Sequence, residues 1–518
     1  MRSTLPSARA VALVLFVLVA LTILPAQTIV HSFEGDNGPE TDKCNAQEVR
    51  CGRQAEMMAA ANGKQVLQVT WQHVNVYDYK GKLLHSQTLP DFIRKAGLDP
   101  NPVSKRANVT DKGPYEPHIV FDEFIGRWVM NLSCLNDCFI VSASSDAGGQ
   151  WHGVYMSCLQ GGTCLDNDPS LQLGYDKNGV YHCAGHVGDD NPNTIKGVAY
   201  DCFAIPPEEV KGIGEGKEPV HLNRHHNMMM HIRPAVDQNP RKGPGEPALF
   251  AARTCDRSVP GGCQNAKNFP FEWLVTTFTW NGSTGTYGED QVIKTDIGSQ
   301  QDKWLYNIPC CGPKSAIPQP GTDIGVRAQE SHRLNNLVQF GSHLQVVFAS
   351  GPCTHDCGAQ GEDKNNVMFW ADLDCTDSAA CKVTQTAKIA GDDVDPLFPS
   401  VGVDNKGNVG IVAASSSEKD YLSILLWTHR TTDPANTFSA PMTLVAGTKP
   451  YTCPNRMNLA LIASAVGMLT VRDPMDGSKL WTTHQYAGDA TPCVWNSRIV
   501  EYQPSAATKS DGKPKAKS

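Results

Sequence analysis

The chain has 518 residues, with 53 aspartate and glutamate residues against 45 lysine and arginine residues, and a formal net charge of −8. This balance argues against a nucleic-acid partner, because binding to phosphates requires a basic face. A membrane-spanning helix needs about 20 consecutive apolar residues. No stretch after the N-terminal region is apolar enough, so we expect no transmembrane segment beyond that region.

The N-terminal region has the pattern of a secretory signal. Two arginines precede an apolar run over residues 10–24, which only Thr22 interrupts, and Pro25 and Ala26 follow. A charged start, an apolar core and a small residue near a cleavage site predict a signal peptide over residues 1–27. We therefore expect a secreted, extracellular protein. An uncleaved signal anchor, which would hold the protein at the cell surface, is the alternative.

The rest of the chain has the pattern of strands and turns. Its apolar runs are short and rich in β-branched and aromatic residues, and glycine, proline, asparagine and aspartate separate them. This pattern predicts an all-β protein. The one helical candidate is short, around Asp91 to Ala96.

A unit of strand, tight turn and strand recurs along the chain. Its clearest copies begin at Pro117, Pro169 and Pro399, and each first strand ends at an aspartate. Looser copies begin near residues 55, 231, 332 and 455, which makes about seven units. Glycine and asparagine suit these turns because they accept the positive φ that two-residue hairpin turns require.

The spacing of these units predicts one β-propeller of about seven four-stranded blades over residues 28–504. Repeats of this kind bury their faces against their neighbours, which favours one closed ring. A β-sandwich or two stacked domains is the alternative. Residues 505–518, rich in lysine and serine, are expected to form a disordered basic tail.

Most of the 18 cysteines lie close to another cysteine along the chain, as expected for disulfides that close loops in an oxidising compartment. Zinc half-sites at Cys134 and Cys138 or at Cys353 and Cys357 are the alternative. Spacing alone leaves the connectivity open, above all for the adjacent Cys310 and Cys311. The cysteines expected in disulfides are Cys44, Cys51, Cys134, Cys138, Cys158, Cys164, Cys183, Cys202, Cys255, Cys263, Cys353, Cys357, Cys375, Cys381, Cys453 and Cys493.

Three acceptor sequons are present, at Asn108, Asn131 and Asn281. They predict N-glycosylation if the host is eukaryotic.

One segment carries a resemblance to a known family. The run from Ser144 to Trp151 matches the Asp-box, Ser-x-Asp-x-Gly-x-Thr-Trp, with Gln150 in place of threonine, and the segment from Asp473 to Trp481 is a degenerate copy. The chain therefore resembles the sialidase-like, secreted β-propellers of unassigned function. The resemblance implies a structural role for the box, in which the aspartate caps a turn and the tryptophan packs between strands.

Sialidases bind the carboxylate of their sugar with three arginines, and a guanidinium offers fixed donors to a carboxylate. Three repeat units here carry an arginine at the start of the first strand, where propellers line their central channel. The resemblance thus implies a cationic floor for an anionic glycan, made of Arg233, Arg333, Asn335, Arg456 and Asn458. Solvated or salt-bridged channel residues are the alternative. The arginine–isoleucine–proline motif and the tyrosine–glutamate pair of sialidases are missing, so sialidase activity is not expected.

The densest histidine cluster includes His221, His225 and His226, which could bind zinc or copper. His231 could instead be the base of a polysaccharide lyase, or the whole segment could be a polar loop. Asp395 lies in an acidic run that could supply a carboxylate for glycoside hydrolysis or bind calcium. Calcium and zinc are thus the candidate cofactors.

These features predict a secreted, glycan-active propeller that is a glycoside hydrolase or polysaccharide lyase acting on an extracellular, anionic polysaccharide. The alternative is a non-catalytic carbohydrate-binding or cell-surface interaction propeller, because the fold hosts all of these functions. The expected partner is an extracellular glycan, and the expected state is a monomer.

Overall fold

The structure is a computed structural model. It describes residues 27–37, 57–100, 115–134, 136–156, 159, 167–187, 198–225, 232–238, 246–254, 272–294, 316–327, 334–350, 365–389, 393–452, 460–461, 470–489 and 495–505. In that part of the chain it contains 33 strands and two helices, so the all-β prediction is confirmed.

Five sheets have the four or five strands of a propeller blade. The first is β2 (Met58–Ala61), β3 (Gln65–Val69), β4 (His73–Asp78) and β5 (Leu83–Thr88). The second is β6 (Tyr115–Asp122), β7 (Arg127–Cys134), β8 (Asn136–Ser142) and β9 (Trp151–Tyr155). The third is β14 (Arg233–Pro234), β16 (Ala248–Thr254), β17 (Glu272–Asn281), β18 (Thr284–Tyr287) and β19 (Gln291–Lys294). The fourth is β26 (Asp395–Val403), β27 (Val409–Ser416), β28 (Ser423–His429) and β29 (Met442–Val445). The fifth is β1 (Thr28–Glu34), β33 (Asn496–Gln503), β32 (Leu480–Tyr486) and β31 (Thr470–Arg472).

The remaining strands form a sheet of nine strands and a sheet of three. The larger has the order β13 (Asn223–His225), β12 (Val198–Ile205), β11 (Gly179–Val187), β10 (Asn167–Asp176), β15 (Val236–Asp237), β22 (Leu337–Phe340), β23 (His343–Ser350), β24 (Val367–Asp374) and β25 (Lys382–Ile389). The smaller is β20 (Ala316–Gln319), β21 (Thr322–Arg327) and β30 (Ala460–Leu461).

The prediction of seven separate four-stranded blades is therefore wrong, since five sheets stand as separate blades. The cause is β15, which pairs in parallel with both β10 and β22 and joins two antiparallel meanders into the nine-stranded sheet. Local repeats in the sequence predict each meander, but they carry no information on a pairing between strands so far apart.

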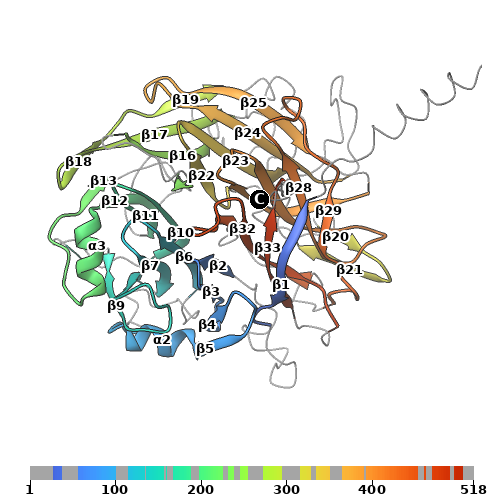
Figure 1. Cartoon of the computed structure of the whole chain (residues 1–518), viewed down its shortest axis with the longest axis horizontal. Coiled ribbons are helices and arrows are strands. Elements are labelled where there is room, and N and C mark those ends of the chain that lie inside the picture. The colour runs from blue at the N-terminus through green and yellow to red at the C-terminus, as the bar shows by residue number, and fades with distance from the viewer. Residues whose placement is uncertain are drawn as a thin grey trace, which may run out of the picture.

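The sheets are arranged as a propeller. They follow one another around a common centre, and the two helices lie at the periphery (Figure 1). Strand β2 contacts β6 and β32, β10 contacts β6 and β14, and β26 contacts β23 and β31. The N-terminal strand β1 pairs with the C-terminal strand β33 in an antiparallel manner, so the two ends of the described chain share one sheet.

The predicted turns owe their shape to buried aspartates. Asp122 accepts hydrogen bonds from the backbone N–H groups of Phe124 and Ile125, and Asp176 accepts from those of Asn178 and Gly179. Both side chains are at most 2% exposed. Each aspartate thus satisfies turn donors that the flanking strands leave unpaired, which confirms a turn at the end of these two first strands. The turn after Asp176 has the two residues expected, whereas four residues separate Asp122 from its partner Arg127.

The residue before proline in two of these first strands is also unusual. Glu116 precedes Pro117 and Phe398 precedes Pro399, and both have positive φ, 52° and 49°, in a region that favours glycine. A bulge interrupts the strand pairing at each position. Because the two share one place in the repeat, this backbone conformation is a feature of the repeat.

Asp122 makes the folding stability depend on pH. Burial raises the pKa of this carboxyl to about 8, so between about pH 4 and pH 8 the folded chain keeps a proton that the unfolded chain has lost. The free energy of unfolding should therefore fall as pH rises through this window. We expect Asp122→Asn to gain stability over the natural chain, by up to about 1.4 kcal/mol for each pH unit, in urea unfolding at pH 4 to 8.

Asp78→Asn is a control for this prediction, because the pKa of Asp78 is shifted in the opposite direction to that of Asp122. It is an exposed turn residue whose pKa is lowered by the backbone N–H of Lys82, so the favourable contribution of its charged form is lost in acid. Asp78→Asn should lose stability relative to the natural chain as pH rises from the lowered pKa to about 3.8, and the difference should then stay constant from pH 4 to 8. The interpretation of Asp122 is wrong if its variant shows the same trend as Asp78→Asn.

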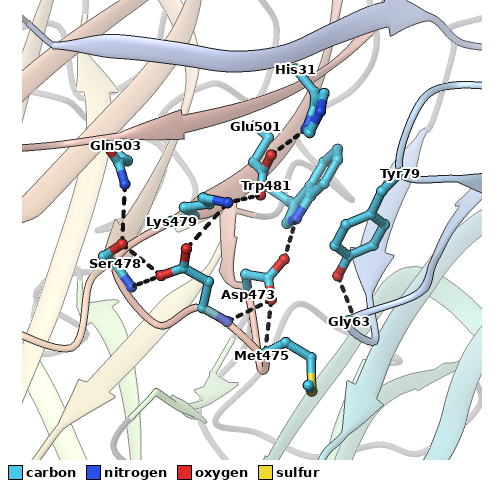
Figure 2. A network of polar contacts seen from close by, with 11 residues as sticks. His31, Gly63, Tyr79, Asp473, Met475, Ser478, Lys479, Trp481, Glu501 and Gln503 are labelled. Atoms are coloured by element: carbon cyan, nitrogen blue, oxygen red, sulfur yellow. Dashed lines mark hydrogen bonds and ion pairs between the residues drawn. The ribbon is translucent and has the colours of Figure 1, made fainter. Parts of the chain in front are cut away.

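A polar network supports the sheet that joins the two ends of the chain (Figure 2). Asp473 accepts hydrogen bonds from the N–H groups of Met475 and Asp476 and from the indole Nε1 of Trp481, at 2.8 to 3.0 Å. Glu501 of β33 lies 2.5 Å from Nδ1 of His31 in β1. The degenerate Asp-box is thus a capped turn of this sheet, and the hydrogen bond between His31 and Glu501 links the neighbouring strands β1 and β33.

Two short helices lie outside the sheets, α2 (Leu89–Lys95) and α3 (Pro207–Gly214). The first confirms the helical candidate near Asp91, and the Thr88 hydroxyl accepts from the Asp91 N–H as an N-cap. The second was not predicted. Neither helix is long and apolar enough to span a bilayer, as far as the structure describes the chain.

Three of the predicted disulfides are present: Cys134–Cys138, Cys183–Cys202 and Cys375–Cys381. Each joins neighbouring antiparallel strands or closes the hairpin between them. These bonds agree with an oxidising, extracellular environment. The other predicted cysteines, at 44, 51, 158, 164, 255, 263, 353, 357, 453 and 493, lie outside the described residues.

Candidate functional site

Part of the predicted cationic floor comes together at the centre of the ring. Arg233 and Asn335 line one cavity, with His118, Gln172 and Asn336 also on its wall. The cavity has a volume of about 10 Å³, which is about the room that one water molecule needs. It is far smaller than a sugar residue.

The polar groups of this cavity tie inner strands together. The Arg233 guanidinium donates to Oε1 of Gln172, and Asn335 donates through Nδ2 to the carbonyl of Pro399 at 2.8 Å. Burial, followed by the nearby charges of Arg233 and His182, places the pKa of His118 well below its usual value. His118 is therefore a neutral group in the wall of this cavity.

Of the other channel and catalytic residues that we predicted, the structure describes only Asp395. Arg333, Arg456, Asn458 and His231 lie outside the described residues. Asp395 is only 6% exposed and accepts hydrogen bonds from Asn365 Nδ2 and the Asn366 N–H, at 2.9 and 2.7 Å. It does not line the cavity of Arg233. Its contacts give it a structural role, because they hold the segment that precedes β24. Its catalytic role stays a prediction without support from this geometry.

The two predicted metal ligands that the structure describes, His221 and His225, contact different partners. Nδ1 of His221 lies 2.7 Å from Glu209, and the ring of His225 packs on Tyr287 at 4.9 Å. His226 lies outside the described residues. Within the described ranges, no three histidine, cysteine or acidic side chains are grouped to hold a metal ion.

The sequons differ in accessibility. Asn131 is fully buried in β7, where its amide lies 2.8 Å from Nδ1 of His182 and donates to the carbonyl of Gln172. This burial leaves no room for a glycan on the folded chain and overturns the prediction for Asn131. Asn281 is exposed at the β17–β18 turn and stays a candidate. Asn108 lies outside the described residues.

A groove of about 420 Å³ lies between the β22–β25 meander and the β26–β29 sheet. Pockets of this size suit small ligands. One wall carries side chains from β23 and β24, and the other is made by the β26–β27 turn and the segment after β28. Its lining includes Phe340, His343, Gln345, Trp370, Asp372, Lys406, His429 and Asp433.

A chain of hydrogen bonds orients the polar wall of this groove. The Trp370 indole donates to Oε1 of Gln345, and Gln345 Nε2 donates to Asp372 Oδ1, both at 2.9 Å. Asp372 also accepts from Nδ1 of His343 at 2.9 Å. Strand pairing explains the arrangement, since Gln345 stands directly opposite Asp372 across β23 and β24. The chain ends on His343, the exposed member of the series, whose side chain is 42% exposed.

The groove therefore presents a preoriented, cation-forming group. The hydrogen bond to Asp372 raises the pKa of His343, and this effect outweighs the burial that lowers it. Lys406 is exposed on the opposite wall, at the β26–β27 turn. Phe340 adds a partly exposed ring, while Trp370, His429 and Phe438 pack together, with ring centres 5.1 to 5.6 Å apart. Such a surface can offer apolar contact and charged donors to a small anionic ligand.

The sequence held only a faint signal for this groove. His343 and Gln345 alternate along one strand, as do Trp370 and Asp372, so each pair faces one side of a sheet. The register that brings the two pairs together, and the neighbouring sheet that forms the other wall, are not visible in either segment alone.

The aspartate of the Asp-box caps its turn, as the resemblance implies, whereas the tryptophan packs against helix α2. Asp146 accepts from the Gly148 N–H at 3.0 Å, and the Trp151 indole donates to the carbonyl of Ala147 at 3.0 Å. Trp151 packs edge-on against Phe92, with ring centres 5.1 Å apart. This is a property of one hairpin, and it does not assign the chain to the sialidase-like proteins.

Comparisons with known proteins assign no family. No protein-family model matches the chain, and no curated protein matches it. Among solved structures, the chain is similar to hydrazine synthase of Kuenenia stuttgartiensis at 9% identity and a TM-score of 0.40, over 82% of this chain and 91% of that chain. It is similar to extracellular domains 1–2 of Drosophila Semaphorin 1b at 7% identity and a TM-score of 0.38, over 93% and 88%. It is similar to an exo-β-1,3-galactanase from Clostridium thermocellum at 9% identity and a TM-score of 0.30, over 80% of this chain and 81% of that chain. We base neither fold nor function on these low scores.

Proposed function

We propose that this protein is a secreted β-propeller that binds an acidic saccharide in the groove between the β22–β25 meander and the β26–β29 sheet. The observation that carries the proposal is His343, which Asp372 holds in place as a donor inside a groove of about 420 Å³. The central cavity, at about 10 Å³, has no such room.

The chemistry of the groove fits this ligand. A sugar carboxylate or sulfate would accept charge-assisted hydrogen bonds from His343 and Lys406, which are stronger than neutral ones. The ring would lie against Phe340, and hydroxyl groups could pair with Gln385 and Thr431, which also line the groove. Binding, with no turnover, is the simplest function that this arrangement supports.

Replacement of His343 should weaken binding strongly. A hydrogen bond to a charged group contributes about 1.5 to 3 kcal/mol, so we expect His343→Ala to bind the saccharide about tenfold to a hundredfold more weakly. The measurement is retention of the secreted protein on an array of sialylated, sulfated, uronate-containing and neutral oligosaccharides, followed by titration calorimetry on the best acidic ligand.

His221→Ala is the matched control, because His221 is also half-exposed and paired with a carboxylate, that of Glu209. It should bind as the natural chain does. Equal binding by His343→Ala and the natural chain would contradict the proposal. Release of new reducing ends or unsaturated uronate from a bound ligand would replace it with a hydrolase or lyase function.

A further inference from the structure

A second groove, remote in sequence from the first, lies between the C-terminal ends of the two helices. It has a volume of about 540 Å³, and its floor is β9, the outermost strand of the β6–β9 sheet. Its walls are residues 96–98 after α2 and residues 213–218 at the end of α3. None of these segments contributes to the groove of His343.

The two walls owe their shape to glycine. Gly97 and Gly216 have φ of 87° and 81°, and each follows the capping residue of its helix. A Cβ at Gly97 would meet no atom within 4 Å, while one at Gly216 would lie 3.3 Å from the ring of His152. Glycine therefore ends both helices here, and at position 216 it also leaves the ring of His152 uncovered by a side chain.

The floor carries an aromatic ring that is fixed from one end. The Tyr155 hydroxyl accepts from the Asp99 N–H at 2.7 Å and donates to the Asp99 carbonyl at 3.1 Å. The side chain is partly exposed and lines the groove on the α2 side of β9, whereas His152 lies on the α3 side, against Gly216. A partly exposed ring whose hydroxyl is already bonded to the backbone is preorganised to stack against a flat, apolar face of a ligand.

The polar groups around this ring are of mixed charge. Lys217 and Glu218 are exposed on the α3 wall, and Nζ of Lys217 lies 2.7 Å from Glu215. With Lys217 paired to Glu215 and Glu218 adding a second carboxylate, this wall carries no net positive charge to attract an anion. It offers donors and acceptors of both kinds, as the hydroxyl groups of an uncharged sugar require.

We propose that this groove is a second saccharide site, specific for a neutral sugar residue whose ring stacks on Tyr155. The protein would then bind two different saccharide units on two separate faces. Such a protein can hold two glycan segments at once, which raises its overall affinity for a surface that carries both units.

The test is the profile of the full secreted chain on the oligosaccharide array. Tyr155→Ala should bind neutral oligosaccharides about tenfold more weakly, or weaker still, and should bind acidic ones as the natural chain does. Tyr155→Phe, which keeps the ring but loses the hydrogen bonds that fix it, should bind neutral ligands with an affinity between those of the natural chain and Tyr155→Ala. His343→Ala should show the reverse pattern, with only the acidic ligands lost.

Each outcome separates the two sites. Neutral retention that survives in Tyr155→Ala, or a natural chain that retains no neutral oligosaccharide, would overturn this second site without affecting the first. Loss of both classes in Tyr155→Ala, with unfolding seen by circular dichroism, would leave the decision to His152→Ala. That variant should weaken only neutral binding, and unchanged neutral binding by it would overturn the proposal.

Discussion

Asp473→Ala should lower the free energy of unfolding by about 3 kcal/mol, because the substitution leaves buried donors without an acceptor. Asp473 is 1% exposed and accepts from the Trp481 indole and from two backbone N–H groups of its own turn. Trp481 itself is fully buried in the sheet that contains both ends of the described chain. Chemical denaturation followed by tryptophan fluorescence measures the loss.

Asp146→Ala is the matched control for this prediction. Asp146 is the aspartate of the complete Asp-box and also caps a hairpin, but its side chain is exposed and water can replace it. Its removal should cost less than about 1 kcal/mol. If the two variants lose equal stability, burial does not explain the effect, and the role that we assign to Asp473 in this sheet is wrong.

The double variant Cys183→Ala/Cys202→Ala should lose about 3 kcal/mol, since the bond closes a loop of about 20 residues in the unfolded chain. The two cysteines stand directly opposite each other across β11 and β12, and both are fully buried. Guanidinium unfolding under non-reducing conditions measures the change.

A shorter loop provides the comparison. Cys375 and Cys381 are separated by six positions, so the double alanine variant at this bond should lose less, about 2 kcal/mol. The reverse order of the two losses would show that loop entropy does not dominate the contribution of these disulfides.

Local features of the fold could be predicted from the sequence, and long-range pairings could not. The turns at Asp122 and Asp176 and the bond between Cys375 and Cys381 depend on residues a few positions apart, which a repeat or a spacing reveals. The parallel pairing of β15 with β10 and β22 joins segments far apart in the chain. No local pattern records it, so the number of separate blades was overestimated.

The difference between local features and long-range pairings also explains which parts of the site could be predicted. Arg233 on β14 and Asn335, which precedes β22, line one cavity, but polarity alone could not separate a ligand contact from a clamp between sheets. Asn335 is such a clamp, because its amide donates to the carbonyl of Pro399 in the neighbouring sheet. The groove of His343 depends on the register between β23 and β24 and on a second sheet, and it was missed.

The central claim is that acidic saccharide binds at His343 and not in the channel. The most direct measurement is a crystal structure of the secreted protein with the best acidic oligosaccharide of the array. We expect the ligand's acidic group against His343 and Lys406, with its ring near Phe340. A ligand held instead at the centre of the ring, beside Arg233, would contradict the account.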